Sequence, residues 1–311
     1  MAAITRRVPY ASILCPVDFS EHAGTALRYA AALARRAHGT LHVVFVNDPL
    51  LVAAAAAAYN TQTLGETSAG ELRRFVRTAV PRQLLRGVTV RYETTIGKPA
   101  REILRLARTQ AADLIVLGTK GLTAAERVLL GSTTTAVLRK TTVPVLAVPP
   151  LPAEERTSGP DKAWPGPEII APIALGPQAA ADMARTADVA RLFGVAVRFV
   201  HAVPPASAPA WLHAEADAHL RIRTAKAATV LERLRRALDG VHTTIDVRAG
   251  SPPDEIAAIA AEHRTGLIVM SLRGREGWFG DAAGAVTYHV LCHAVAPVLA
   301  LPVQRAPARR R

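Results

Sequence analysis

The chain has 311 residues, of which half are apolar and a fifth are charged, as is typical of a globular protein. Its net charge is +13, but aromatics make up only 5 % and no basic helix carries interleaved aromatics, so specific nucleic-acid binding is disfavoured. No apolar run is long enough to span a bilayer, and two cysteines are too few for a disulfide framework. The N-terminal segment lacks the apolar core of a secretory signal, so we expect a cytoplasmic protein with reduced thiols.

The two halves of the chain repeat one another. ADLIVLGTKG at residues 112–121 returns as TGLIVMSLRG at residues 265–274. From Gly97 through Pro144, the first half matches the second at a constant offset of 153 residues, which short chance matches would not give. An internal duplication therefore predicts two domains, and each half serves as a control on the other.

The expected domain boundaries follow from this repeat. The first domain covers residues 8–150 and the second covers residues 168–304. Residues 151–167 are rich in proline, polar and without periodicity, which is typical of a linker. Residues 305–311 form a short basic tail.

Predicted strands and helices alternate in both halves. In the first half we expect strands at 13–17, 41–46, 88–95, 114–117 and 145–148, and helices at 21–38, 64–85, from 97 onward and 132–140. In the second half we expect strands at 169–173, 196–200, 243–249, 267–270 and 298–301. Pro81 should kink or shorten the second helix. Strands separated by helix-length segments predict right-handed βαβ units, and hence two tandem, doubly wound, Rossmann-like parallel sheets.

A glycine-rich spacing marks the end of the fourth strand. Gly118 and Gly121 are followed, after nine residues, by Gly131 and Ser132 at the start of a helix. Glycines allow close backbone approach, and a first helical turn presents N–H donors without intrahelical partners. The pattern is typical of phosphate binding, although turn and cap glycines are an alternative at each position. Ser132 either caps the helix or bonds a phosphate oxygen.

This G-x2-G-x9-G-S spacing resembles the nucleotide signature of the universal stress protein family. PVDFSE at 16–21 is similar to the end of the family's first strand. Gly97-Lys-Pro99 is similar to its third loop, and VPVLAVP at 143–149 to its last strand. The resemblance covers nearly the whole chain as two copies, which corresponds to the tandem form of the family.

The resemblance implies five strands per sheet in the order 3-2-1-4-5, with a crevice where the order reverses. It also implies that ATP, alone or with Mg²⁺, binds in the first half. Asp18 would then lie near the nucleoside, the backbone of Val46 would contact adenine, and Lys120 would add charge near the phosphates. The implied site residues are Pro16, Val17, Asp18, Val46, Gly118, Lys120, Gly121, Gly131, Ser132, Thr133 and Thr134. For Asp18, a helix-capping role is the alternative.

The second half departs from this pattern where the chemistry matters. Ala174 corresponds to Asp18, Ser271 to Gly118 and Ala285 to Ser132, while Gly274 and Gly284 keep the spacing. Trp278 and Phe279 enter the intervening loop. The second half has thus lost a carboxylate and a hydroxyl, and it carries a side chain where the backbone would have to approach a phosphate closely. These differences predict one nucleotide per chain, bound in the first half.

Catalytic groups are hard to find in the sequence. There is no G-x4-G-K-[ST] loop, no metal-binding pair of histidines or cysteines and no evident base for an attacking water. We therefore expect no enzyme, or at most weak ATP hydrolysis. The leading interpretation is a nucleotide-dependent stress-response protein with an unidentified protein partner, and the alternatives are a nucleotide-free scaffold and a slow ATPase. The resemblance further implies an internal pseudo-dimer formed through the last strands, and a homodimer.

Overall fold

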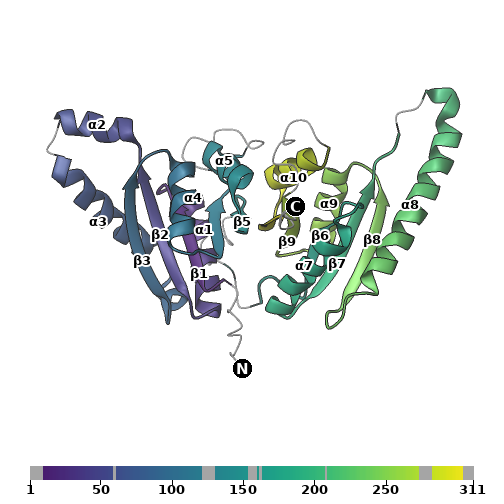
Figure 1. The fold of residues 1–311 in the computed structure, drawn as a ribbon, viewed down its shortest axis with the longest axis horizontal. Helices are drawn as coiled ribbons and strands as arrows, with labels where there is room; N and C mark the ends of the chain where they lie inside the picture. The colour runs from purple at the N-terminus through teal and green to yellow at the C-terminus, as the bar shows by residue number, and fades with distance from the viewer. Residues whose placement is uncertain are drawn as a thin grey trace, which may run out of the picture. The chain divides into compact units, whose positions relative to one another are not determined.

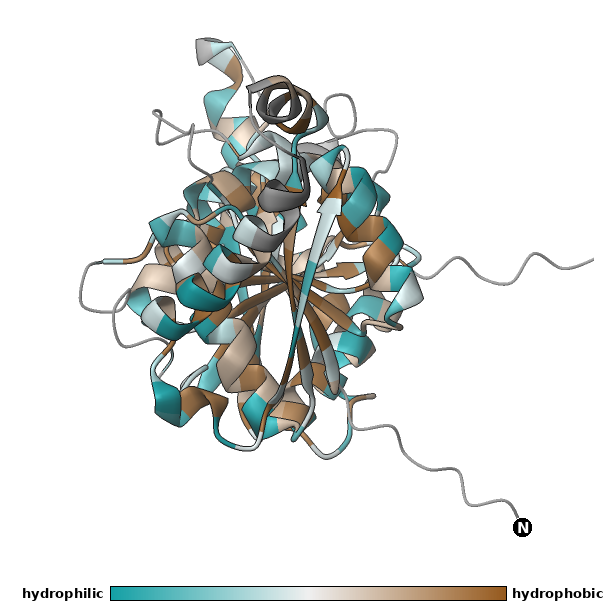
Figure 2. Cartoon of the chain, turned by 90° about the vertical axis from the view of Figure 1, so that its left-hand side faces the viewer, coloured by the Kyte–Doolittle hydropathy of each residue, from teal (hydrophilic) through white to brown (hydrophobic). Residues whose placement is uncertain are grey.

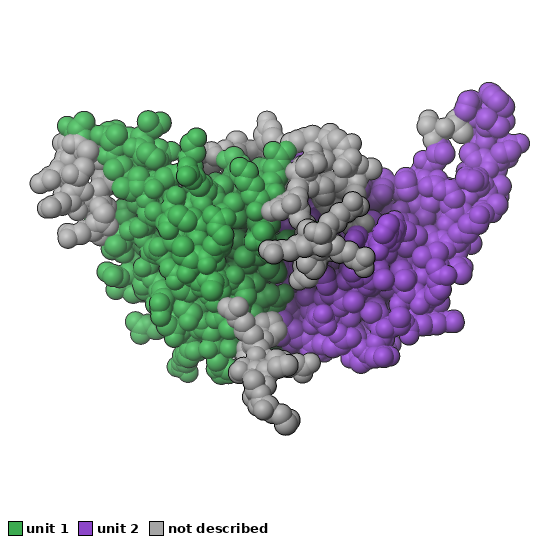
Figure 3. Space-filling model, viewed as in Figure 1, with its two compact units in different colours: residues 1–161, 302–311 green, residues 162–301 purple. Residues whose placement is uncertain are grey.

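The structure, a computed structural model, describes residues 10–58, 61–120, 130–152, 160, 163–206, 209–272 and 282–303. The chain divides into two compact units, residues 1–161 with 302–311 and residues 162–301 (Figure 3). Each unit contains a parallel sheet with helices packed against it (Figure 1). The predicted α/β class is confirmed.

In the first unit the strands lie in the order β3-β2-β1-β4-β5, and neighbouring strands are parallel. The strands are β1 (Ser12–Val17), β2 (Thr40–Asn47), β3 (Thr89–Ile96), β4 (Leu114–Gly118) and β5 (Val145–Val148). The helices are α1 (Glu21–Arg36), α2 (Pro49–Ala58), α3 (Thr61–Ala79), the 3-10 helix η1 (Arg82–Leu85), α4 (Pro99–Thr109) and α5 (Ser132–Lys140). Helix α1 packs with α3, and α4 packs with α5, so helices cover both faces of the sheet. The strand order reverses between β1 and β4.

The core of this unit lies along the two central strands. Ile13 and Leu14 in β1 are completely buried, and the apolar residues 114–117 of β4 are all buried as well. Continuous apolar strands of this kind are expected where helices cover both faces of a parallel sheet. Figure 2 shows hydrophobic residues concentrated in the strands and hydrophilic residues on the outer faces of the helices. The buried centre therefore holds the ends of β1 and β4 in fixed positions.

Two helical segments differ from the prediction. Helix α3 ends at Ala79, and η1 follows Pro81, so the proline shortens the predicted helix as its missing N–H requires. The alanine-rich stretch that the sequence analysis did not assign is helix α2. It begins directly after Asp48, whose Oδ1 accepts a hydrogen bond from the backbone N–H of Leu50 at 2.8 Å. Alanine has the highest helix propensity, so both the cap and the composition favour a helix there.

The second unit repeats the plan, with the strand order β8-β7-β6-β9-β10. Its strands are β6 (Glu168–Pro172), β7 (Ala196–Val203), β8 (Thr243–Ala249), β9 (Ile268–Leu272) and β10 (Val298–Pro302). Its helices are α7 (Ala179–Phe193), the 3-10 helix η2 (Ala210–Leu212), α8 (His213–Arg235), α9 (Pro252–Glu262) and α10 (Ala282–His293). The side chain of Phe199 in β7 is completely buried. Counted along the chain, each unit has the 3-2-1-4-5 order that the resemblance implies.

Both cysteines carry free thiols. Cys15 is buried in β1, and burial raises the pKa of its thiol because the thiolate would lose its hydration. Cys292 lies in α10 and is partly exposed. Among the residues with assigned structure, no helix is both long enough and apolar enough to cross a membrane.

Candidate functional site

A cavity of about 430 Å³ opens in the first unit at the carboxyl ends of the strands, where the strand order reverses. Ten of the eleven residues predicted for the site line it, and the eleventh, Gly121, lies outside the described residues. The predicted residues in its wall are Pro16, Val17, Asp18, Val46, Gly118, Lys120, Gly131, Ser132, Thr133 and Thr134. Open parallel sheets bind ligands at this position, and the volume is in the range of small-molecule sites.

The carboxylate of Asp18 is held at the end of β1 by Ser20. Asp18 Oδ1 accepts hydrogen bonds from the backbone N–H of Ser20 at 3.0 Å and from Ser20 Oγ at 2.5 Å. Ser20 is itself the N-cap of α1, because its Oγ accepts a hydrogen bond from the N–H of Ala23 at 3.1 Å. Phe19 makes this turn with a left-handed φ of 63°. The alternative of Asp18 as the cap is therefore wrong, and its carboxylate is oriented in the cavity wall instead.

Removal of the Ser20 hydroxyl should weaken both functions of this turn. We expect Ser20→Ala to lower the free energy of unfolding by about 0.5–2 kcal/mol through loss of the cap. It should also weaken binding of a ligand that contacts Asp18, because the carboxylate loses a short, charge-assisted hydrogen bond. Urea denaturation and ligand titration of the same sample measure the two effects. Ser20→Asp keeps an oxygen that can cap α1, but its carboxylate repels Asp18 and cannot donate a hydrogen bond to it. Compared with Ser20→Ala, this variant should therefore regain much of the stability but not the ligand binding.

Helix α5 begins at the opposite side of the cavity and is fastened to the end of β4. Thr134 Oγ1 donates to the carbonyl of Gly118 at 2.8 Å, and the N–H of Gly131 donates to the carbonyl of Thr119, also at 2.8 Å. Gly131 is the N-cap of α5 and makes no side-chain cap. Ser132 is the first helical residue, so of the two alternatives for Ser132 the capping role is wrong. Its exposed side chain lines the cavity.

The start of α5 has the donor set that an anion requires. The first N–H groups of an α-helix have no partner within the helix, and here they belong to the turn of Ser132 and Thr133. The hydroxyls of both residues add donors beside the positive end of the helix dipole. The chemistry of this end therefore fits a phosphate group.

The structure gives a steric reason for glycine at position 118 that the sequence analysis did not give. A Cβ at this position would lie 3.2 Å from the carbonyl oxygen of Lys120 and 3.3 Å from that of His22. Both contacts are tighter than ordinary packing, and both are with backbone. The glycine thus lets β4, its following turn and α1 meet at the rim of the cavity.

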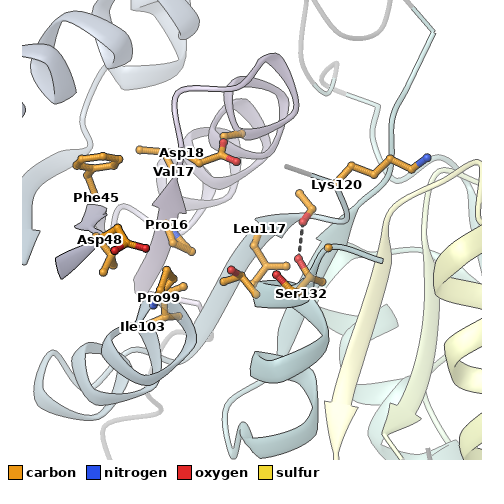
Figure 4. Close-up of a pocket in the computed structure, with 16 residues that line it drawn as sticks. Pro16, Val17, Asp18, Phe45, Asp48, Pro99, Ile103, Leu117, Lys120 and Ser132 are labelled. Atoms are coloured by element: carbon orange, nitrogen blue, oxygen red, sulfur yellow. Dashed lines mark hydrogen bonds between the residues drawn. The ribbon is translucent and has the colours of Figure 1, made fainter. Parts of the chain in front are cut away.

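Val46 and Lys120 occupy different ends of the cavity. The pairing of β1 with β2 ends at Val17 and Phe45, whereas β2 and β3 remain paired to Asn47, so the backbone of Val46 lies beyond the end of β1. The backbone N–H and C=O of Val46 on the side of β1 therefore face the crevice, where they can hydrogen-bond to a ligand. The side chain of Lys120 extends away from the other labelled residues (Figure 4), so its charge is not aimed at the centre of the cavity.

The sequence analysis missed several residues in the cavity wall. Phe45 lies across from Ser132 (Figure 4). The centroid of its ring is 4.4 Å from the centroid of the Phe19 ring. Asp48 lies beside Phe45 (Figure 4), and the remaining residues are Ala23, Pro99, Ile103 and Leu117. Asp48 alone had a usable signal, since it follows the end of a strand next to β1. This side of the cavity is apolar and aromatic, and it suits a flat ring.

The second unit has a smaller cavity, of about 280 Å³, at the corresponding place. Ala174 and Ser271, the counterparts of Asp18 and Gly118, both line it. By the constant offset Gly284 corresponds to Gly131, yet Gly284 lies inside α10 instead of capping it. In an α-helix each N–H donates to the carbonyl four residues earlier. The N–H groups of the residues that follow Gly284 are therefore used within α10, whereas those at the start of α5 have no partner within their helix.

Among the residues described, no group of three or more histidine, cysteine, aspartate or glutamate side chains could hold a metal ion. Among the described residues of the first cavity wall, the carboxylates are those of Asp18 and Asp48. They fit contacts with hydroxyl or amino groups of a ligand, which donate hydrogen bonds.

Comparison with known proteins agrees with this architecture. The Universal stress protein family model matches residues 9–149 and again 168–302. A universal stress protein of Methanocaldococcus jannaschii is 30 % identical over 139 residues, which cover 45 % of this chain and 82 % of that protein. One from Thermus aquaticus is 34 % identical over 153 residues, which cover 45 % of this chain and 98 % of that protein. The crystal structure of a universal stress protein from Archaeoglobus fulgidus shares the fold at 17 % identity, with a TM-score of 0.61, over 95 % of this chain and 97 % of that chain.

The two matched segments together cover most of the chain, and they coincide with the two copies of the repeat. The chain therefore belongs to the universal stress protein family, and it is a tandem member with two family domains.

Proposed function

We propose that the first unit binds one adenine nucleotide, ATP in the first instance, and that its occupancy regulates a stress response. Membership of the family supports the stress-response role. The observation that carries nucleotide binding is the cavity of about 430 Å³ with an aromatic side at Phe45 and a helix start at Ser132. These two ends suit the two ends of a nucleotide, a flat base and a polyphosphate.

The proposed placement assigns one part of the ligand to each wall. The adenine ring lies against Phe45 and Ile103, and the backbone of Val46 hydrogen-bonds to the edge of the ring. The ribose hydroxyls donate to Asp18, which Ser20 holds in place. The phosphates accept from the first turn of α5 and from the hydroxyls of Ser132 and Thr133. Mg²⁺, if it accompanies ATP, is then carried mainly by the phosphates, as is usual for this ion.

The second unit is proposed to bind no nucleotide. A phosphate at its cavity would meet the side chain of Ser271 and a helix whose start lies further back, and Ala174 offers no carboxylate to a ribose. This difference between the two units predicts the number of nucleotides bound per chain. We expect one ATP per chain in isothermal titration calorimetry with Mg-ATP.

Two measurements test the proposal together. Mass spectrometry of small molecules released from freshly purified protein should recover an adenine nucleotide in a ratio of up to one per chain. Calorimetry on the emptied protein should return a stoichiometry of one. A value of two would contradict the asymmetry, and the absence of binding would favour a scaffold that needs no nucleotide.

A further inference from the structure

Two histidines lie one helical turn apart on the outer face of α10. His289 and His293 are both exposed, and the centroids of their rings are 6.4 Å apart. The opposite face of the helix carries Val290 and Leu291, which are buried where α10 packs with α9 and β9. The packing of this face fixes the direction in which the two imidazoles project. The sequence analysis overlooked this His-x3-His spacing, and neither residue lines a described cavity.

This spacing gives the two imidazoles the geometry of a chelate. Residues four apart on an α-helix project from the same face, with Cβ atoms about 5–6 Å apart. A metal such as Zn²⁺ binds imidazole nitrogen at about 2.0–2.1 Å, so two nitrogens of one tetrahedral site lie roughly 3.3 Å apart. Both side chains are exposed, so rotation about their χ angles can bring one nitrogen of each ring to that separation. The same i, i+4 pairing of histidines holds zinc on the helix of H-E-x-x-H metalloproteases.

The two rings are available to an ion. Within the described parts of the chain, the contacts of these imidazoles are with each other and, for His289, with the ring of Tyr288 at 6.3 Å between centroids. A metal ion would therefore displace water from the nitrogens and would break no ion pair. Cys292 lies between the histidines in the sequence, but no group of three metal-ligating side chains occurs among the described residues, so the chelate consists of the two imidazoles.

The ligand chemistry defines the class of ion. Imidazole suits Zn²⁺, Ni²⁺ and Cu²⁺, whereas Mg²⁺ and Ca²⁺ prefer oxygen ligands. We propose that His289 and His293 bind one divalent transition-metal ion, with water in its remaining coordination positions. The site belongs to the second half alone, because the constant offset places Ala136 and Lys140 of α5 at the corresponding positions. This proposal stands whether or not the first unit binds ATP.

The test is a calorimetric titration of the full-length protein with Ni²⁺, a probe that does not oxidise thiols. The protein is first freed of nucleotide, because phosphates also bind metal ions, and excess Mg²⁺ is present to occupy sites made of oxygen ligands. We expect one Ni²⁺ per chain. His289→Ala and His293→Ala should each lower the affinity about tenfold or more, because the second imidazole then no longer binds intramolecularly.

Matched variants locate the ion. His242→Ala removes an exposed histidine of the same unit that lies outside α10, so Ni²⁺ affinity should stay unchanged. Cys292→Ser removes the neighbouring thiol and should also leave the affinity unchanged. Circular dichroism verifies that each variant keeps the fold, as expected for exposed side chains. The proposal would be overturned by a parent protein that does not bind Ni²⁺, by unchanged affinity in both α10 histidine variants, by an equal loss in His242→Ala, or by a loss confined to Cys292→Ser.

Discussion

Replacement of Ser132 by glutamate is expected to abolish ATP binding and to leave the fold at least as stable. An acidic residue in the first turn of a helix is favourable by about 0.3–1 kcal/mol, so α5 should tolerate the change. The same carboxylate faces the cavity that is proposed to hold the phosphates. Two like charges about 4 Å apart near a protein surface repel by about 4 kcal/mol, which corresponds to a loss of roughly 1000-fold in affinity. Calorimetry with Mg-ATP and thermal denaturation measure the two effects.

Two further variants locate the cause. Ser132→Ala removes one hydroxyl and should weaken binding only about 2- to 10-fold, as expected for a single hydrogen bond. Ala285→Glu places the same charge at the counterpart position of the second half, and ATP affinity should not change. If Ser132→Glu bound ATP like the parent protein, the phosphates would not lie at the start of α5. If Ala285→Glu lost binding as well, the effect would come from overall charge.

The largest effect on stability is expected in the second unit. Phe199 is completely buried in β7, between β6 and β8, so its replacement by alanine leaves a large cavity. We expect Phe199→Ala to lower the free energy of unfolding by about 3–5 kcal/mol. The loss should appear in the unfolding transition of this unit, followed by circular dichroism in urea. ATP binding at 25 °C should persist, because the proposed site belongs to the first unit.

Trp211 provides the matched comparison in the same unit. It is a larger aromatic residue, but 77 % of its surface is exposed in η2. Trp211→Ala should therefore change the free energy of unfolding by less than about 0.5 kcal/mol. A similar loss from both variants would mean that burial does not determine the contribution of these aromatic side chains.

The sequence was informative wherever a functional residue comes directly after a buried strand. Asp18 and Gly118 were predictable for this reason, since an apolar run fixes the strand and the strand order brings neighbouring ends together. Phe45 was not predictable, because its strand is apolar along nearly its whole length. Which of its side chains faces the crevice depends on the register with β1, and the register depends on packing that no single strand encodes.

Local hydrogen bonding was the second limit of the prediction. The sequence allowed Asp18 or Ser132 to cap a helix, and both caps lie elsewhere, at Ser20 and Gly131. The position of a cap depends on single backbone angles, such as the left-handed φ of Phe19. The role of Gly118 was likewise assigned to ligand approach, whereas the crowding at its Cβ position comes from the protein's own carbonyls. The tandem pairing of the two units through their last strands stays a prediction.

The two hydrogen bonds that fasten the start of α5 to β4 have an energetic consequence. Because Thr134 and Gly131 already hold this turn, its N–H groups point in fixed directions before any ligand arrives. The conformational entropy of that segment is lost during folding and not during association. An anion that associates with this turn does not have to order it, so less of its electrostatic gain is offset by conformational entropy.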